Sequence, residues 1–224
     1  ADYSQIELRL LAAFSLDENL LQSFKKGEDI HAKVASELMG IPIEMVNKDM
    51  RRMAKAVNFG IIYGISDFGL SQNTSISVKK AHDYIQLYFT RFPKIKAYLD
   101  GSVEQAREKG YVTTISGRRR QIPEIKSSNF NLRAFGERAA MNMPLQGSAA
   151  DIMKVAMLKV DDALKNANLK SKLVLQVHDE IIVDCFEEEA AQVKEIVKRE
   201  MENAVTLACP LVAETEEGKT LYEA

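Results

Sequence analysis

The sequence predicts an α+β protein in which a helical subdomain is inserted into a platform of antiparallel sheet and helices. Apolar residues recur at helical spacing through most of the first hundred residues. At Tyr111 the pattern changes to short β-branched and aromatic runs separated by turn residues. Two apolar runs, residues 172–177 and 181–186, flank a short polar tip and are spaced as a hairpin.

The helices of the first half are indicated by apolar periodicity together with capping residues. Polar residues that accept hydrogen bonds begin helices, and glycines, which tolerate a left-handed backbone, end them. The expected ranges are residues 6–14, 20–24, 34–38, 47–64, 77–91 and 93–109, with Asn47 and Ser77 as N-caps, Pro93 in a first turn, and Gly27, Gly40, Gly64 and Gly110 as stops.

The second half is expected to alternate strands and helices. Residues 111–122 form a hairpin around Ser116-Gly117, and Pro144 is expected to break the helical pattern that follows, because proline lacks an N–H donor. The remaining expected elements are helices over residues 129–142 and 148–166, strands over 172–177 and 181–186, a Glu-rich helix over about 187–205 and a short C-terminal strand.

Composition bounds the class of protein. The 224 residues are 46% hydrophobic and 28% charged, which suits one large or two small globular domains. No apolar run reaches the roughly 18 residues of a membrane span, and no leader is recognisable, so no membrane partner is expected. Cys185 and Cys209 lack metal-ligand spacing and are expected to be small buried thiols in a reduced intracellular compartment.

Charge is polarised along the chain although the net charge is only −2. Residues 107–138 carry eight Lys and Arg against three acidic residues, a local charge of +5. Residues 187–223 carry ten Glu against four basic residues, a local charge of −6. This distribution is expected if one face of the protein meets phosphate and the acidic tail faces solvent.

The hairpin tip His178-Asp179-Glu180 places two adjacent carboxylates between apolar strands. Such carboxylates are costly to bury unless a cation satisfies them, although a solvated turn also favours Asp. Asp2 is a candidate partner in holding a divalent metal. Glu7 has a local alternative, since Ser4 and Glu7 fit a capping box that opens the first helix.

Within residues 47–64, a basic pair and an aromatic pair share one side of the expected helix, because Arg51, Lys55, Phe59 and Tyr63 are spaced by four. Cations in the first turns oppose the helix dipole, so an external anion there would relieve the conflict. The alternative is a solvated basic face. Gly60 inside the helix costs about 1 kcal/mol relative to Ala and suggests close approach by something large.

A third pattern combines Arg138, Asn142 and Gln146, again spaced by four, with the arginines of the 111–122 hairpin. Donors of this kind suit phosphates and the acceptor atoms that all base pairs share in the minor groove. Arg118 and Arg119 are therefore candidate DNA contacts. An ordinary surface helix is the alternative interpretation.

Taken in order, five segments resemble the motifs of family A DNA polymerases, the bacterial DNA polymerase I type. They are DYSQIELR, RRMAKAVNFGIIYG, GRRR, ERAAMNMPLQGSAAD and LQVHDE. The resemblance covers essentially the whole chain. It implies a polymerase palm (residues 1–20 and 111–224) with inserted fingers (residues 21–110), motif B on the helix at about 48–64 and motif C on the hairpin at about 172–186.

The resemblance also implies site residues and partners. Asp2 and Asp179 are expected to hold two Mg²⁺ ions, with Glu180 as the adjacent third carboxylate. The substrates are primer-template DNA and deoxynucleoside triphosphates. The roles implied for other positions are triphosphate contacts for Arg51, Lys55 and His31, with Lys55 as proton donor to pyrophosphate; deoxyribose packing for Phe59; template-base stacking for Tyr63; 2′-hydroxyl exclusion for Glu7; minor-groove contacts for Arg138, Asn142 and Gln146; and a primer-terminus contact for His178.

The family's thumb and exonuclease-like domain precede motif A and are expected to be missing from this chain. A monomer acting in the cytoplasm, at the bacterial nucleoid, is implied. The C-terminal residues 214–224 keep the family's Gly and aromatic pattern without its usual tryptophan. Two other functions stay open on the residues alone: a DNA-binding remnant without turnover, and a two-metal nuclease. A remnant should have lost at least one of Asp2, Asp179, Lys55 and Arg51, which are all present. A nuclease has no use for a helix that binds a triphosphate.

Overall fold

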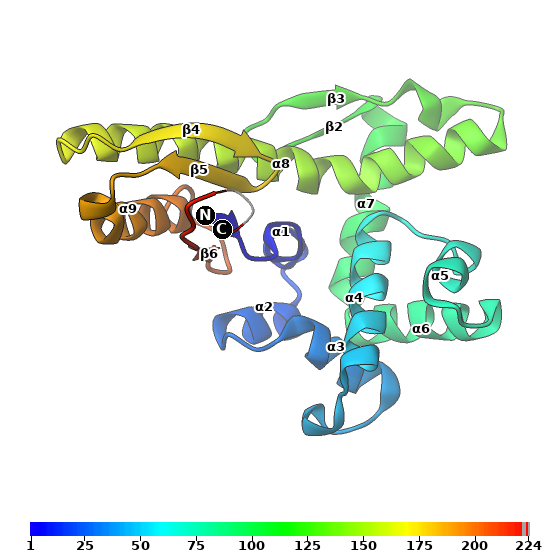
Figure 1. Ribbon diagram of the computed structural model, residues 1–224. Coiled ribbons are helices and arrows are strands. Elements are labelled where there is room, and N and C mark those ends of the chain that lie inside the picture. Colours follow the sequence, from blue (N-terminus) through cyan, green and yellow to red (C-terminus); the bar gives the residue numbers. More distant parts are fainter. Residues whose placement is uncertain (221–222, 224) are drawn as a thin grey trace.

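The computed structural model describes residues 1–220 and 223. Its larger sheet has the strand order β4-β5-β1-β6 and draws strands from both ends of the chain. β4 (Lys172–Val177) and β5 (Glu180–Asp184) form a hairpin, and β1 (Asp2–Tyr3) lies antiparallel between β5 and β6 (Ala213–Glu214). Figure 1 shows this sheet at one end of the long helix α8 (Phe130–Asn166), with the helices formed by residues 6–91 below α8 in this view. The α+β class is confirmed.

The segment between β1 and β2 is helical, as the apolar spacing predicts. Asn47 and Ser77 cap their helices by accepting hydrogen bonds from Met50 N and Lys80 N. One helix escapes the pattern because its apolar residues lack helical periodicity. The elements are α1 (Ile6–Ser15), α2 (Glu18–Lys25), α3 (Ile30–Met39), η1 (Ile43–Met45), α4 (Lys48–Ile62), α5 (Asp67–Thr74), which is the helix missed, α6 (Val78–Arg91) and α7 (Pro93–Lys109).

The predicted break at Pro144 is wrong, because α8 (Phe130–Asn166) continues through the proline as one helix of 37 residues. Pro144 removes one intrahelical hydrogen bond. Packing compensates for this loss, since Pro144 and its neighbours Met143 and Leu145 are buried. In addition, the buried Ser148 hydroxyl donates to the Pro144 carbonyl.

A second, smaller sheet packs on the other half of α8. It consists of β2 (Tyr111–Thr113) and β3 (Arg119–Gln121), followed by η2 (Pro123–Lys126). Its apolar side chains form a separate small core with α7 and α8: Val103, Ala106, Val112, Ile122, Ile125, Ala140 and Met143. The predicted hairpin is therefore fixed to α8, along the helix that carries the Arg, Asn and Gln pattern.

The C-terminal region differs from prediction at two boundaries. β5 ends at Asp184 because Phe186 N donates to Ser171 Oγ instead of to a strand. Residues 187–189 form a short 3-10 helix, η3 (Glu187–Glu189), and α9 (Ala190–Glu202) begins only after Glu189 accepts hydrogen bonds from the 170–171 loop. The predicted helix over 187–205 is accordingly shorter. Part of the C-terminal pattern, at residues 221, 222 and 224, lies outside the described residues.

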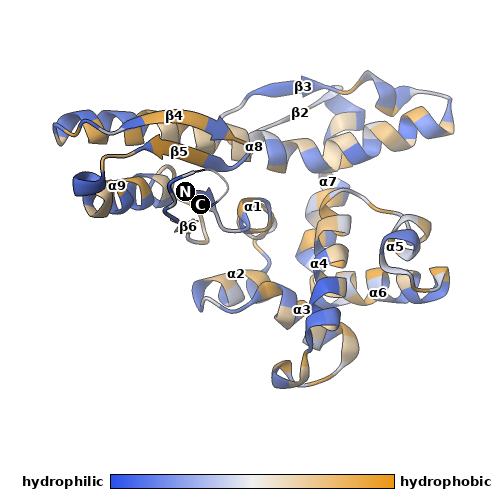
Figure 2. Ribbon diagram, viewed as in Figure 1, coloured by the Kyte–Doolittle hydropathy of each residue, from blue (hydrophilic) through white to orange (hydrophobic). Residues whose placement is uncertain are grey.

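The main core joins β1, β5 and β6 to the helical segment. Figure 2 also shows apolar colouring on β4, but most of its apolar side chains are exposed. Cys209 is buried as expected, but Cys185 is exposed, because it lies just beyond the end of β5. Among the helices in the described part of the chain, none is long and apolar enough to cross a membrane.

Candidate active site

Strand pairing brings the predicted carboxylates together from opposite ends of the sequence. Asp2 on β1 is directly opposite Glu180 on β5, and Tyr3 N donates to the Asp179 carbonyl at 3.1 Å. The tip is a two-residue turn, His178-Asp179, instead of the three residues predicted, because Val177 pairs with Glu180. His178 takes a left-handed backbone with φ of 51°.

The electrostatics show that this cluster is short of positive charge. The pKa of Asp2 rises from 3.8 to about 6, first because its carboxyl is partly shielded from solvent, although the residue as a whole is exposed, and then because of repulsion from Asp179 and Glu180. Like charges raise a carboxyl pKa in this way until a cation neutralises them.

The donor set fits a divalent cation such as Mg²⁺, which prefers hard carboxylate oxygens. In residues 1–220 and 223, no group of three or more His, Cys, Asp or Glu side chains forms a ready-made metal cage. Mg²⁺ in nucleotide enzymes is characteristically held by one or two carboxylates together with substrate phosphates. Asp2 and Asp179 therefore suit a site that a substrate completes.

The predicted cationic side of α4 is exposed, and the structure supplies part of its counter-charge. Arg51 Nε lies 2.6 Å from Asp29 Oδ2. Asp29 also caps α3, accepting hydrogen bonds from His31 N and Ala32 N. The sequence predicts an anion near the first turns of α4, and for Arg51 this anion is the Asp29 carboxylate. A triphosphate that binds Arg51 would have to displace Asp29 or share Arg51 with it.

Lys55 and Phe59 continue this side of α4, with Lys55 Nζ 5.9 Å from the Phe59 ring centroid. His31 from α3 lies against the same ring at 6.0 Å between centroids. The His31 side chain is buried, at 3% exposure, and its Nδ1 lies 3.0 Å from Nδ2 of Asn58. Arg51, Lys55, Phe59 and His31 are therefore brought together at one end of the site.

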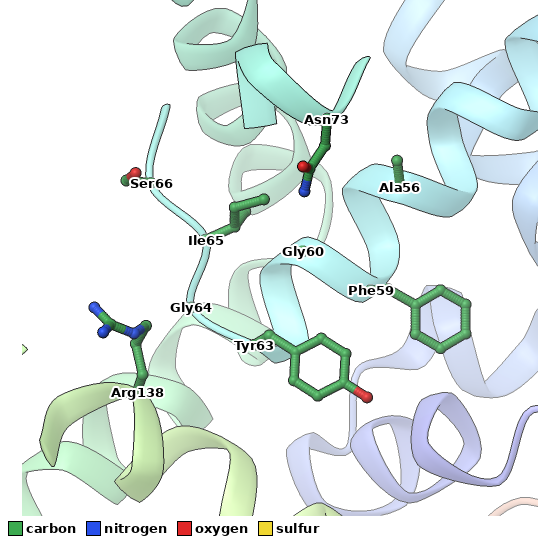
Figure 3. Close-up of a pocket in the computed structure, with 9 residues that line it drawn as sticks. All are labelled: Ala56, Phe59, Gly60, Tyr63, Gly64, Ile65, Ser66, Asn73 and Arg138. Atoms are coloured by element: carbon green, nitrogen blue, oxygen red, sulfur yellow. The ribbon is translucent and has the colours of Figure 1, made fainter. Parts of the chain in front are cut away.

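The glycine in α4 has an internal explanation. Ile65 N bonds to Gly60 O and Gly64 N bonds to Ile61 O, the pair of bonds that ends a helix at a left-handed glycine. A Cβ on Gly60 would lie 2.6 Å from Ile65 Cγ2. The close approach predicted at Gly60 is therefore made by Ile65, and Figure 3 shows both beside a cavity of about 470 Å³ that Tyr63 and Arg138 also line.

Glu7 lies at the junction of three helices. Tyr63 Oη donates to Glu7 Oε2 at 3.0 Å. Burial raises the pKa of Glu7, and hydrogen bonding to Tyr63 and Gln146 partly offsets the rise. The alternative capping box is not formed, because α1 begins at Ile6 with Gln5 as an N-cap that makes no side-chain bond. Glu7 thus joins α1 to the end of α4 and to Gln146 on α8.

The polar pattern on α8 follows the same side of the helix. Arg138 and Gln146 are exposed, and Asn142 Nδ2 is a buried donor that has no partner among the residues that the structure describes. A buried unpaired donor is costly, which makes this amide suited to an acceptor from a ligand. A Cβ on Gly64 would lie 3.0 Å from Arg138 Cγ, so the end of α4 rests against this side of α8.

The hairpin arginines have partners within the protein. Arg118 pairs with Asp151 at 2.8 Å and donates to the Gly147 carbonyl at 2.9 Å. Arg119 lies over the Tyr111 ring at 4.7 Å from its centroid. Asp151 also accepts from Ser116, so it fixes the turn of the β2–β3 hairpin to α8 one turn beyond Gln146.

Sequence reasoning missed three residues that organise the site: Asp29, Asn58 and Asp151. Only Asp29 has a local signal, since it precedes His31 as an N-cap residue. Asn58 lies on the buried, apolar side of α4, and a single polar residue in an apolar pattern does not by itself indicate a function. Asp151 meets Arg118 and Ser116 only when the β2–β3 hairpin packs on α8, so the sequence gives no local signal for its role.

Carboxylates at a sheet hairpin, together with a helix that carries cationic and aromatic side chains, are residue types that suit phosphoryl transfer. The chain matches the model of DNA polymerase family A over residues 1–223. It is 57% identical over 223 residues to DNA polymerase I of Caldicellulosiruptor bescii, and 51% identical over 224 residues to that of Bacillus subtilis. The chain belongs to DNA polymerase family A.

These comparisons cover all of this chain but only 26% of each relative, so the chain spans about a quarter of their length. A solved structure, the POL domain of Pol1 from M. smegmatis in complex with DNA primer-template and dNTP, has a TM-score of 0.90 and 46% identity. That comparison covers 93% of this chain and 37% of the other. Family A polymerases generally use divalent metal ions.

Proposed function

We propose that this chain is the catalytic part of a template-directed DNA polymerase, adding deoxynucleotides to a primer 3′-hydroxyl. The observation that carries the proposal is the meeting of Asp2 with Asp179 and Glu180 on adjacent strands. Burial is the main cause that raises the pKa of Tyr63, at the end of α4, and that of Glu7, and the negative charge of Asp179 adds a smaller rise to each.

Asp2 and Asp179 would hold two Mg²⁺ ions, which supply activation of the 3′-hydroxyl and neutralisation of the leaving pyrophosphate. Glu180 adds negative charge beside them. Arg51 pairs with the triphosphate after release from Asp29, and Lys55 donates a proton to the leaving pyrophosphate. These cations confine the triphosphate between α4 and the sheet.

The aromatic residues at the end of α4 and Glu7 select the sugar of the incoming nucleotide. Phe59 packs against the sugar, while Glu7, held by Tyr63, fills the space that a ribose 2′-hydroxyl needs. Tyr63 stands in the position of a stacked template base, next to the cavity in Figure 3. The Glu7–Tyr63 hydrogen bond links sugar selection to the placement of this ring.

Primer-template DNA is the proposed partner, as it is in the M. smegmatis complex. Arg138, Asn142 and Gln146 contact the minor groove, His178 reaches the primer terminus, and Arg119 contacts phosphate together with Arg118, which Asp151 orients. In this proposal residues 1–20 and 111–224 are the palm, residues 21–110 are the fingers, and the protein acts as a monomer in the bacterial cytoplasm.

A primer-extension assay tests the proposal. The chain is joined to the upstream region of the C. bescii relative, which is 57% identical across the shared part, and given a labelled primer on one template. Growth of the primer according to the template supports a polymerase. Tight binding without growth would indicate a DNA-binding remnant, and shortening of the strand by the chimera, absent from an Asp179→Asn control, would indicate a nuclease.

A further inference from the structure

Asn58 is a fully buried polar residue of α4, at 0% exposure, and its side chain meets His31 of α3. The Asn58 amide nitrogen lies 3.0 Å from His31 Nδ1. α3 and α4 pack closely, so this contact crosses the interface between the helix that carries the basic residues and the helix that Asp29 caps.

The chemistry of the pair determines where the ring proton lies. An amide nitrogen only donates hydrogen bonds, so Nδ1 of His31 accepts and carries the lone pair. In a neutral ring the proton is then on Nε2. The pKa of His31 falls from 6.5 to about 4, mainly because of burial and then because of Arg51 and Lys55, with Asp29 opposing. The ring is therefore neutral at physiological pH.

The second ring nitrogen is left for a ligand. The buried polar side-chain atoms without a partner in the described residues are Gln5 Oε1, Asn58 Oδ1, Tyr88 Oη and Asn142 Nδ2, and His31 Nε2 is not one of them. Nε2 makes no hydrogen bond in the described part of the chain, and His31 keeps 3% of its surface exposed. Arg51 and Lys55 lie near enough to lower the ring's pKa, which places His31 beside the cationic side of α4.

We propose that Asn58 is a positioning residue that fixes His31 in the Nε2–H tautomer, so that the ring offers a neutral N–H donor to the triphosphate of the incoming nucleotide. The identity of that anion rests on the proposed function; the tautomer does not. The other neutral tautomer would turn a lone pair toward phosphate oxygens, which repel it. Losing the donor is expected to raise KM for the nucleotide about tenfold.

The tautomer is measured by ¹⁵N NMR of the histidine rings in the protein, with and without dATP. Both the spectra and the kinetics use the chimera with the upstream region of the C. bescii relative, and a His31→Gln variant identifies the His31 signal. Two variants change the partner of Nδ1: Asn58→Leu removes it, and Asn58→Asp replaces the donor with an acceptor. Thermal melting of each variant reports whether it folds.

The wild type is expected to show an unprotonated Nδ1 and a protonated Nε2 whose signal shifts when dATP binds. Asn58→Leu should give a mixture of tautomers, and Asn58→Asp should move a proton to Nδ1. KM for the nucleotide should rise in both, with kcat changed less than about threefold. A protonated Nδ1 in the wild type, or the same tautomer in all three proteins, would overturn the assignment. The tautomer pattern without a dATP shift would overturn the triphosphate contact, and absence of primer extension would separately refute the proposed function.

Discussion

Asp2→Asn tests the electrostatics of the carboxylate cluster through stability as well as activity. Asparagine keeps the size and backbone pairing of Asp2 while removing its charge. In the metal-free protein that charge is unfavourable, first because the carboxyl is partly shielded from solvent and then because Asp179 and Glu180 repel it. We therefore expect the variant to be more stable than the wild type without Mg²⁺, although it has lost a proposed metal ligand.

The magnitude follows from the pKa. A rise from 3.8 to about 6 would be worth about 3 kcal/mol in a fully buried site. Asp2 is exposed, so solvent screening reduces the expected effect to about 1 kcal/mol. Because the folded-state pKa is raised, this part of the stability is present below the unfolded-state pKa and is lost as pH rises through about 6.

The assay is thermal melting at pH 7.5 and pH 5 in EDTA and in Mg²⁺, with Asp184→Asn as the control. Asp184 is an exposed aspartate at the far end of β5. At pH 7.5 in EDTA, Asp2→Asn should raise Tm by roughly 2–4 °C, and the gain should shrink at pH 5. Mg²⁺ should stabilise the wild type more than the variant. A variant that melts below the wild type in EDTA at pH 7.5 would refute the reasoning.

Three further substitutions test other parts of the site. Glu7→Ala should raise ribonucleotide relative to deoxyribonucleotide incorporation in competitive extension, whereas Glu7→Gln, of similar size, should keep most of the selectivity; equal selectivity in all three proteins would remove Glu7 from sugar recognition. Phe59→Tyr should increase incorporation of dideoxynucleotides, because the added hydroxyl can replace the missing 3′-OH, and unchanged discrimination would contradict the assignment. Asp29→Asn keeps a good N-cap but frees Arg51, so KM for the nucleotide should fall several-fold in steady-state assays. A rise in KM would show that Asp29 orients Arg51 instead of competing for it.

Local chemistry was sufficient to predict most of the elements, whereas the roles of the candidate site residues come from the family resemblance. Asn47 and Ser77 cap as predicted because an N-cap depends only on the following turn. The two apolar runs around Asp179 and Glu180 predict that these carboxylates lie at a hairpin tip. Their partner Asp2 was assigned from the family resemblance, since pairing between the two ends of a chain leaves no local signal.

Predictions failed where tertiary packing outweighs a local preference. Pro144 lies within α8 because the burial of Pro144 and its neighbours Met143 and Leu145 outweighs the cost of the missing N–H donor. Gly60 suggested a ligand, but the side chain that approaches it is Ile65, five residues on. The partners of Arg51 and Arg118 were not predictable, because Asp29 and Asp151 meet them only through helix packing.

The central claim is that the carboxylates of the sheet perform chemistry on a triphosphate held by α4. Single-turnover extension by the C. bescii chimera tests it most directly, comparing wild type, Asp179→Asn and the Asp184→Asn control on a preformed primer-template complex. Asp179→Asn should slow extension by more than about a thousandfold while primer-template affinity stays within about threefold, and the control should match the wild type. Near-normal extension by Asp179→Asn would contradict the account.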